Sequence, residues 1–170
     1  SLGEWRNTIV NNRAFGKDPE VVLKHARAYV KGVQKSNMLV CAKHFPGDGV
    51  IERDQHLVLG VNELSCDEWD KSFGKVYKEL IDDGIETVMV GHIALPEYSY
   101  KLNPDLTYQD ILPASLSVEL LDTLLKEKLG FNGLVVTDAS HMVGIAAAME
   151  REKAVPTTIA SGCDMFLFFN

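Results

Sequence analysis

The run Leu134-Val135-Val136-Thr137 is apolar nearly throughout and is followed at once by Asp138. A strand with one solvated face alternates apolar and polar residues, so a continuous apolar run predicts a strand that is covered on both faces. Three other short runs have the same character, at residues 39–42, 87–90 and 165–169. Four such strands are typical of a parallel sheet with helices packed on it.

Amphipathic stretches separate these predicted strands and predict helices over residues 19–34, 67–82 and 117–129. Asp18 is a suitable N-cap for the first helix, with Pro19 at its first position, and Gly130 follows the third. Strands alternating with crossover helices indicate an α/β fold. No repeat or linker interrupts the pattern, so residues 1–170 are expected to form one domain.

Composition and charge exclude several classes of partner. The net charge of -7 argues against a nucleic-acid surface, which needs clustered Lys and Arg. No uncharged apolar run is long enough to span a membrane, so no membrane partner is expected. The three cysteines form no CxxC pair, and no signal segment opens the chain, which predicts a cytoplasmic location.

Polar residues with catalytic chemistry follow three of the predicted strands directly: Lys43 and His44, then His92, then Asp138. In parallel α/β folds the segments after the carboxyl ends of the strands build the active site. Each residue alone is as readily a solvated or capping group at a strand end. Their recurrence at three strands favours a shared site, to which the polar loops at residues 46–61 and 95–113 would contribute.

The sequence KHFPGDG at residues 43–49 continues to Asp54-Gln55-His56. It closely resembles the KHFPGxG…DxH signature of the β-N-acetylglucosaminidases of glycoside hydrolase family 3. The first half is shared by many family 3 enzymes. The DxH at this spacing is typical of the N-acetylhexosaminidase branch, in which a histidine replaces the usual carboxylic acid.

Further matches extend the resemblance over essentially the whole chain. They are RAFG at 13–16 with DP at 18–19, GHI at 91–93, PASLS at 113–117 and GFNGLVVTDA at 130–139. Two positions depart from the family pattern, since Asp48 stands where a histidine is common and Val50 where an aspartate is common.

The resemblance implies a role for each matching residue. Asp138 would be the nucleophile that attacks the anomeric carbon, and Asp54 with His56 would form the acid/base dyad. Arg13, Lys43, His44 and His92 would contact the sugar, His92 with the weakest claim. A histidine can exchange protons near neutral pH while a neighbouring carboxylate orients its ring. Without the motif before it, the Asp54/His56 pair would be interpreted as an Asx-turn beside a surface histidine.

The resemblance also implies the C-terminal part of a (β/α)8 TIM barrel, with about four parallel strands, incomplete as an isolated chain. The open sheet would expose apolar edges in water. We therefore expect either a homodimer that covers the open barrel or a rearranged sheet.

The implied function is that of a retaining glycoside hydrolase that releases terminal β-linked N-acetylglucosamine through a covalent glycosyl-enzyme. Muropeptides from the cell wall or chitooligosaccharides are the expected substrates. Two alternatives stay open: a β-N-acetylglucosaminide phosphorylase of the same family, and a sugar-binding fragment without turnover. No metal or nucleotide motif is present, so no cofactor is expected.

Overall fold

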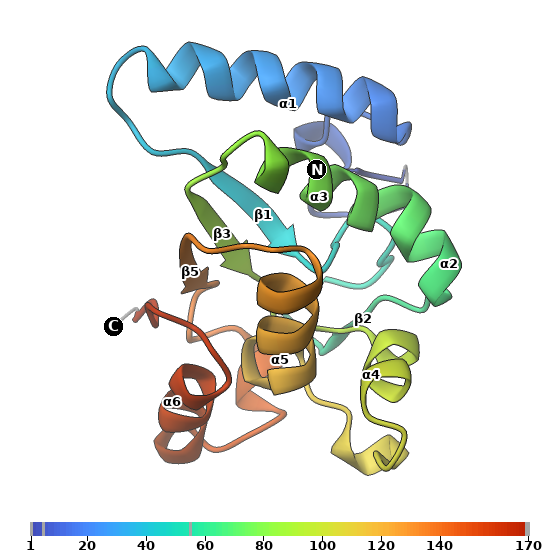
Figure 1. Cartoon of the computed structure of the whole chain (residues 1–170). Helices are drawn as coiled ribbons and strands as arrows, with labels where there is room; N and C mark the ends of the chain where they lie inside the picture. Colours follow the sequence, from blue (N-terminus) through green and yellow to red (C-terminus); the bar gives the residue numbers. More distant parts are fainter. Residues whose placement is uncertain (1, 5, 55, 169–170) are drawn as a thin grey trace.

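The computed structural model describes residues 2–4, 6–54 and 56–168. Three strands, β1 (Cys41–Phe45), β3 (Thr87–Val90) and β5 (Leu134–Thr137), form a parallel sheet in the order β1-β3-β5 (Figure 1). In the central strand, Thr87 lies opposite Cys41 on one side and Leu134 on the other. The predicted α/β class with parallel strands is therefore confirmed.

A second, two-stranded parallel sheet lies beyond the ends of β1 and β3. It pairs β2 (Gly60–Val61) with β4 (Ile93–Ala94). The backbone N–H of Asn62 extends the pairing by donating to the Ala94 carbonyl at 2.9 Å. This short sheet ties the loop that follows β1 to the segment that follows β3.

The first predicted helix is confirmed at both ends as α1 (Pro19–Gln34). The Asp18 carboxylate caps it by accepting hydrogen bonds from the backbone N–H groups of Glu20 and Val21 at 2.9 and 3.0 Å. These bonds satisfy donors that the first helical turn leaves free. α1 packs beside α3 (Lys75–Asp82), as Figure 1 also shows.

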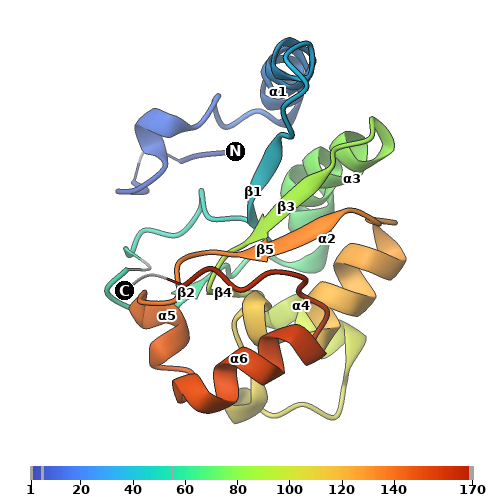
Figure 2. The same cartoon turned by 90° about the vertical axis from the view of Figure 1, so that its left-hand side faces the viewer.

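The other two predicted helices are also present. α2 (Cys66–Trp69), the π-helix η2 (Asp70–Gly74) and α3 follow one another without a break and cover the predicted stretch 67–82. The π-helix η5 (Glu119–Lys128) lies within the predicted stretch 117–129. In Figure 2, α2 and α3 lie on one side of the sheet and the N-terminal segment lies on the other.

The sequence patterns missed several helices. The stretch 95–113, expected as a loop, contains α4 (Pro96–Leu102), whose buried residues include Tyr98 and Ser99. Pro96 occupies its first turn, and the spacing of Leu95, Tyr98 and Leu102 is helical, so the signal was present. The remaining short elements are η1 (Asn11–Arg13), η3 (Tyr108–Asp110), η4 (Ala114–Leu116), α5 (Val143–Ala146) and α6 (Arg151–Ala160).

The first strand begins two residues later than residues 39–42 predicted. The carbonyl of Val40 accepts a hydrogen bond from the Thr87 hydroxyl at 2.9 Å, and the strand pairing starts at Cys41. Lys43 and His44 consequently lie within β1 and do not follow it. The register shifts between Lys43 and Phe45.

The fourth predicted strand, residues 165–169, is wrong over its described part. Only Met165 forms a bridge, opposite Val136 of β5. The next backbone N–H in register, that of Leu167, donates to the hydroxyl of Thr137 at 2.9 Å and not to a backbone carbonyl. A side chain thus takes the place of the ladder partner and ends the pairing. Phe169 lies outside the described residues.

The main core fills the space between the sheet and the helices. It contains Val88 and Val90 of the central strand, Trp69 and Leu80 of the helices, and a large set of other buried apolar side chains. Around the free edge of β1, Tyr29, Met38 and Leu39 are exposed. No helix among residues 2–4, 6–54 and 56–168 has the length and apolar character needed to cross a membrane.

Candidate active site

The carboxyl ends of the three strands of the main sheet meet at one edge. The backbone N–H of Gly91, after β3, donates to the Phe45 carbonyl of β1 at 2.8 Å. The N–H of Asp138, after β5, donates to the Val90 carbonyl of β3, also at 2.8 Å. These two bonds bring the polar residues of three chain segments together, as the strand order predicts.

His44 lies between two carboxylates at this edge. Its Nε2 is 3.6 Å from Oδ2 of Asp138, and its Nδ1 is 3.4 Å from Oδ2 of Asp48. His44 and Asp48 are buried, whereas 18% of the Asp138 side chain is exposed. The predicted nucleophile is therefore partly accessible to solvent, while the His44 imidazole lies beside its Oδ2.

Asp48 was noted from the sequence only as a departure from the family pattern, yet its carboxylate faces the site. The amide of Asn7 donates to the Asp48 carbonyl at 2.7 Å and to the Ile51 carbonyl at 2.8 Å, which fixes the main chain here. An acid three residues after the end of β1, within the loop that follows the strand, was the available signal. Its partner Asn7 is too distant in sequence to be predicted.

The carboxylate of Asp138 is oriented by its own main chain. Its Oδ1 accepts a hydrogen bond from the backbone N–H of Ala139 at 2.8 Å. The carbonyl of Ala139 in turn accepts from Nε2 of His92 at 3.1 Å. His92 is fully buried, and its Nδ1 is 2.8 Å from the hydroxyl of Ser115. Burial lowers the pKa of His92, outweighing the Ala139 hydrogen bond and the charge of Asp138, which raise it.

Asp54 and His56 form a pair on the loop between β1 and β2. Oδ1 of Asp54 accepts from the backbone N–H of His56 at 2.8 Å and lies 2.7 Å from its ring Nδ1. Desolvation is the largest influence on the Asp54 pKa and raises it, but the His56 backbone and ring together lower it below its ordinary value. The Asx-turn and the carboxylate–imidazole pair are thus both present in one structure.

The histidine of this pair is accessible. About half of the His56 side chain is exposed. Its carbonyl accepts a hydrogen bond from the backbone N–H of Val143 at 3.4 Å, in the segment that follows Asp138. The dyad loop therefore contacts the segment of the predicted nucleophile. The Nε2 side of the ring stays available to a second molecule, since Nδ1 faces Asp54.

Close packing holds the loop that connects His44 to the dyad. Gly47 has φ +138°, and a Cβ there would lie 2.6 Å from the ring of Phe73. A Cβ on Gly49 would lie 1.7 Å from the Leu2 carbonyl oxygen. The indole N–H of Trp69 donates to the Pro46 carbonyl at 2.7 Å. Space therefore requires a glycine at both positions of the KHFPGDG motif, and backbone conformation requires one at Gly47 as well.

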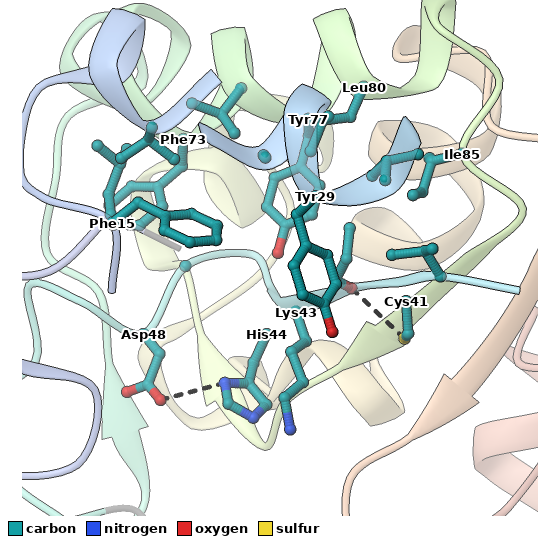
Figure 3. A pocket seen from close by; sticks show the side chains of 18 of the residues that line it. Phe15, Tyr29, Cys41, Lys43, His44, Asp48, Phe73, Tyr77, Leu80 and Ile85 are labelled. Carbon is teal, nitrogen blue, oxygen red and sulfur yellow. Dashed lines mark hydrogen bonds and ion pairs between the residues drawn. The ribbon is translucent and has the colours of Figure 1, made fainter. Parts of the chain in front are cut away.

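A cavity of about 300 Å³ opens beside β1, and Arg13, Lys43, His44 and Asp48 line it. Figure 3 shows Lys43, His44 and Asp48 along one side, opposite the apolar side chains of the α2–α3 helical stretch. Arg13 and Lys43 are exposed and can move toward a bound molecule. Three of the four predicted sugar contacts therefore share one cavity, while His92 is buried against Ser115 and Ala139.

The described residues contain no group of three or more His, Cys, Asp or Glu side chains that could hold a metal ion. The chemical groups available at this edge are carboxylates and imidazoles, together with the cationic side chains of Arg13 and Lys43 in the cavity. A carboxylate with an exposed face, together with an accessible histidine paired to a second carboxylate, can carry out nucleophilic and proton-transfer steps.

Comparison with known proteins places this geometry in a family. The chain is 53% identical to a "Beta-N-acetylglucosaminidase/beta-glucosidase" of Cellulomonas fimi over 96% of its length, covering 29% of that protein. It is 32% identical to a "Beta-hexosaminidase" of Neisseria gonorrhoeae, over 98% of this chain and 44% of that one. Among solved structures, "Beta-glucoside phosphorylase BglX bound to 2FGlc" matches with 46% identity and a TM-score of 0.95, over 97% of this chain and 30% of that one.

The chain spans less than half the length of each of these relatives. The model of the family described as "Glycosyl hydrolase family 3 N terminal domain" matches residues 3–170. This match confirms the resemblance found in the sequence motifs. Because that model matches nearly the whole chain, the chain belongs to glycosyl hydrolase family 3.

Proposed function

We propose that the protein carrying this chain cleaves terminal β-linked N-acetylglucosaminides by a retaining mechanism with Asp138 as nucleophile. The observation that carries the proposal is the position of Asp138 at the joined strand ends. There its carboxylate is partly exposed, and His44 Nε2 lies 3.6 Å from its Oδ2. The names of the Cellulomonas fimi and Neisseria gonorrhoeae relatives support the N-acetylglucosamine substrate class.

The proposed reaction has two steps. In the first, a carboxylate oxygen of Asp138 forms a bond to the anomeric carbon while the glycosidic C–O bond breaks, and His56 gives a proton to the leaving oxygen. In the second, a water molecule attacks the anomeric carbon, His56 takes a proton from that water, and the bond to Asp138 breaks. Asp54 orients the His56 ring through the 2.7 Å contact at Nδ1 and stabilises its charged form.

Arg13, Lys43 and His44 are proposed to bind sugar hydroxyls, because all three line the same cavity. Muropeptides or chitooligosaccharides are the proposed substrates. The three parallel strands correspond, in this proposal, to the C-terminal part of a (β/α)8 barrel. A second copy of the chain could cover the free edge of β1, where Tyr29, Met38 and Leu39 are exposed.

Phosphorolysis is the second candidate, and the 46% identity to a protein described as a β-glucoside phosphorylase favours it. In that reaction phosphate replaces water in the second step and yields a sugar 1-phosphate. A neutral histidine does not repel an incoming phosphate, whereas a carboxylate acid/base would repel it. The exposed position of His56 is compatible with either acceptor.

The deciding experiment measures p-nitrophenol release from p-nitrophenyl β-N-acetylglucosaminide, with and without phosphate. It uses this chain and a longer polypeptide that carries it. Asp138→Asn is expected to reduce turnover at least about 1,000-fold, whereas Asp122→Asn, at an exposed position on η5, serves as the matched control. Free N-acetylglucosamine as product supports hydrolysis, and a sugar 1-phosphate supports phosphorolysis. Sugar binding without turnover in any polypeptide would refute both and leave a binding fragment.

A further inference from the structure

His92 is a buried histidine whose hydrogen bonds define its protonation state. It has no exposed surface, and both ring nitrogens have partners within the protein. The partner of Nε2 is the carbonyl oxygen of Ala139, which can only accept a hydrogen bond. Nε2 must therefore carry a proton. In the neutral ring that leaves Nδ1 as an acceptor.

The hydroxyl of Ser115 is the partner that this tautomer requires. Its Oγ lies 2.8 Å from Nδ1, and Ser115 is itself fully buried in η4. A hydroxyl can rotate to donate to an unprotonated ring nitrogen. Burial of His92 lowers its pKa and favours the neutral ring. Ser115, His92 and the Ala139 carbonyl thus form a directed chain of two hydrogen bonds.

These hydrogen bonds end on Ala139, whose backbone N–H binds the Asp138 carboxylate. The Ala139 N–H donates to Oδ1 of Asp138 at 2.8 Å, and the Asp138 N–H donates to the Val90 carbonyl. The Ala139 carbonyl, which follows directly, is fixed by His92 and also accepts from the N–H of Met142 at 3.2 Å. A rotation of this segment would move the N–H that orients the carboxylate.

We propose that His92, as the neutral Nε2–H tautomer held by Ser115, is a positioning residue for the Asp138 carboxylate and does not contact the sugar. The proposal rests on the proposed function in assigning Asp138 as the nucleophile. It replaces the sugar contact that the family resemblance implied for His92. It also gives a role to Ser115, which lies 23 residues from His92 in the sequence.

The first test needs no activity and uses nitrogen-15 NMR of the imidazole and of the Ala139 amide in this chain. We expect a protonated Nε2 and an unprotonated Nδ1 for His92 at pH 7. We also expect the Ala139 amide resonance to move in His92→Phe and to return toward its original position in His92→Gln, which restores a donor. A protonated Nδ1, or an unmoved Ala139 amide in His92→Phe, would overturn the proposal.

The second test separates positioning from sugar binding by kinetics in the longest active form of the protein. His92→Phe is expected to lower kcat about 10- to 100-fold, the scale of a misplaced reacting group, with KM changed less than about threefold. His92→Gln should recover part of kcat, and Ser115→Ala should fall between the native protein and His92→Phe. A rise in KM with kcat unchanged would instead make His92 a sugar contact.

Thr158→Val provides the buried control, since the Thr158 hydroxyl is buried and has no hydrogen-bond partner among the described residues. It should leave both kinetic constants and the Ala139 amide unchanged. If Asp138→Asn keeps full activity, the proposed function fails. The NMR result then still shows whether His92 orients the Asp138 segment.

Discussion

Trp69→Phe tests how the loop that follows β1 is held against the helices. The indole N–H donates to the Pro46 carbonyl at 2.7 Å, and Trp69 has no exposed surface. Phenylalanine keeps an aromatic ring between Phe45 and Tyr98, whose centroids lie 6.2 and 5.0 Å from that of Trp69. The substitution thus removes one donor and part of a ring while preserving most of the apolar contact.

The expected destabilisation has two parts. Leaving a buried carbonyl without its donor costs about 1–3 kcal/mol. The smaller ring leaves a void that the packed surroundings close only in part, which adds about 1 kcal/mol. Together they predict a loss of about 2–4 kcal/mol in the free energy of unfolding, or about 5–15 °C in Tm for a chain of this length.

Urea unfolding followed by far-UV circular dichroism measures this loss. Tyr108→Phe is the matched control, because Tyr108 is 86% exposed and its hydroxyl can bond to water in either state. It should change stability by less than about 0.5 kcal/mol. If Trp69→Phe is no more destabilising than Tyr108→Phe, the indole does not hold the Pro46 loop, and the reasoning is refuted.

Three further predictions follow from packing and burial. Gly49→Ala should lower the yield of folded protein strongly, because its Cβ would lie 1.7 Å from the Leu2 carbonyl oxygen. Gly32→Ala, whose Cβ would have no atom within 4 Å, should raise the free energy of unfolding by up to about 1 kcal/mol, as measured by thermal unfolding. The pKa of His92 is lowered in the fold, so its contribution to stability is complete above about pH 6.5 and is lost as the pH falls below that value. The Tm of the native chain should then fall more steeply between pH 7 and 5 than that of His92→Phe, and equal slopes would contradict this. A thiol reagent at pH 8 should label exposed Cys41 well before buried Cys163, whose pKa is raised to about 11 by burial. Mass spectrometry of the labelled protein gives the order, and labelling of Cys163 first would contradict the prediction.

The candidate site was predictable from sequence in its outline, because motif residues at strand ends come together by a general rule of parallel sheets. His44 lies 3.6 Å from Asp138 for that reason, and Lys43 lines the same cavity as His44. The local pair of Asp54 and His56 was predictable too, since its members lie two positions apart and the contact forms within one turn.

The sequence by itself determined the elements whose signals are local. The cap at Asp18 defined the start of α1, and continuous apolar runs defined three of the four predicted strands, because burial on both faces leaves a pattern within a few residues. Only the tertiary structure decided where β1 begins and why the pairing stops after Met165. The Thr87 hydroxyl donates to the Val40 carbonyl just before β1, and the Thr137 hydroxyl accepts from the Leu167 N–H just after Met165. The two hydrogen bonds that link Ser115 to His92 and His92 to Ala139 could likewise not be predicted from the sequence. They span 23 and 47 residues, and hydrogen bonds between distant residues leave no periodicity that a local pattern could carry.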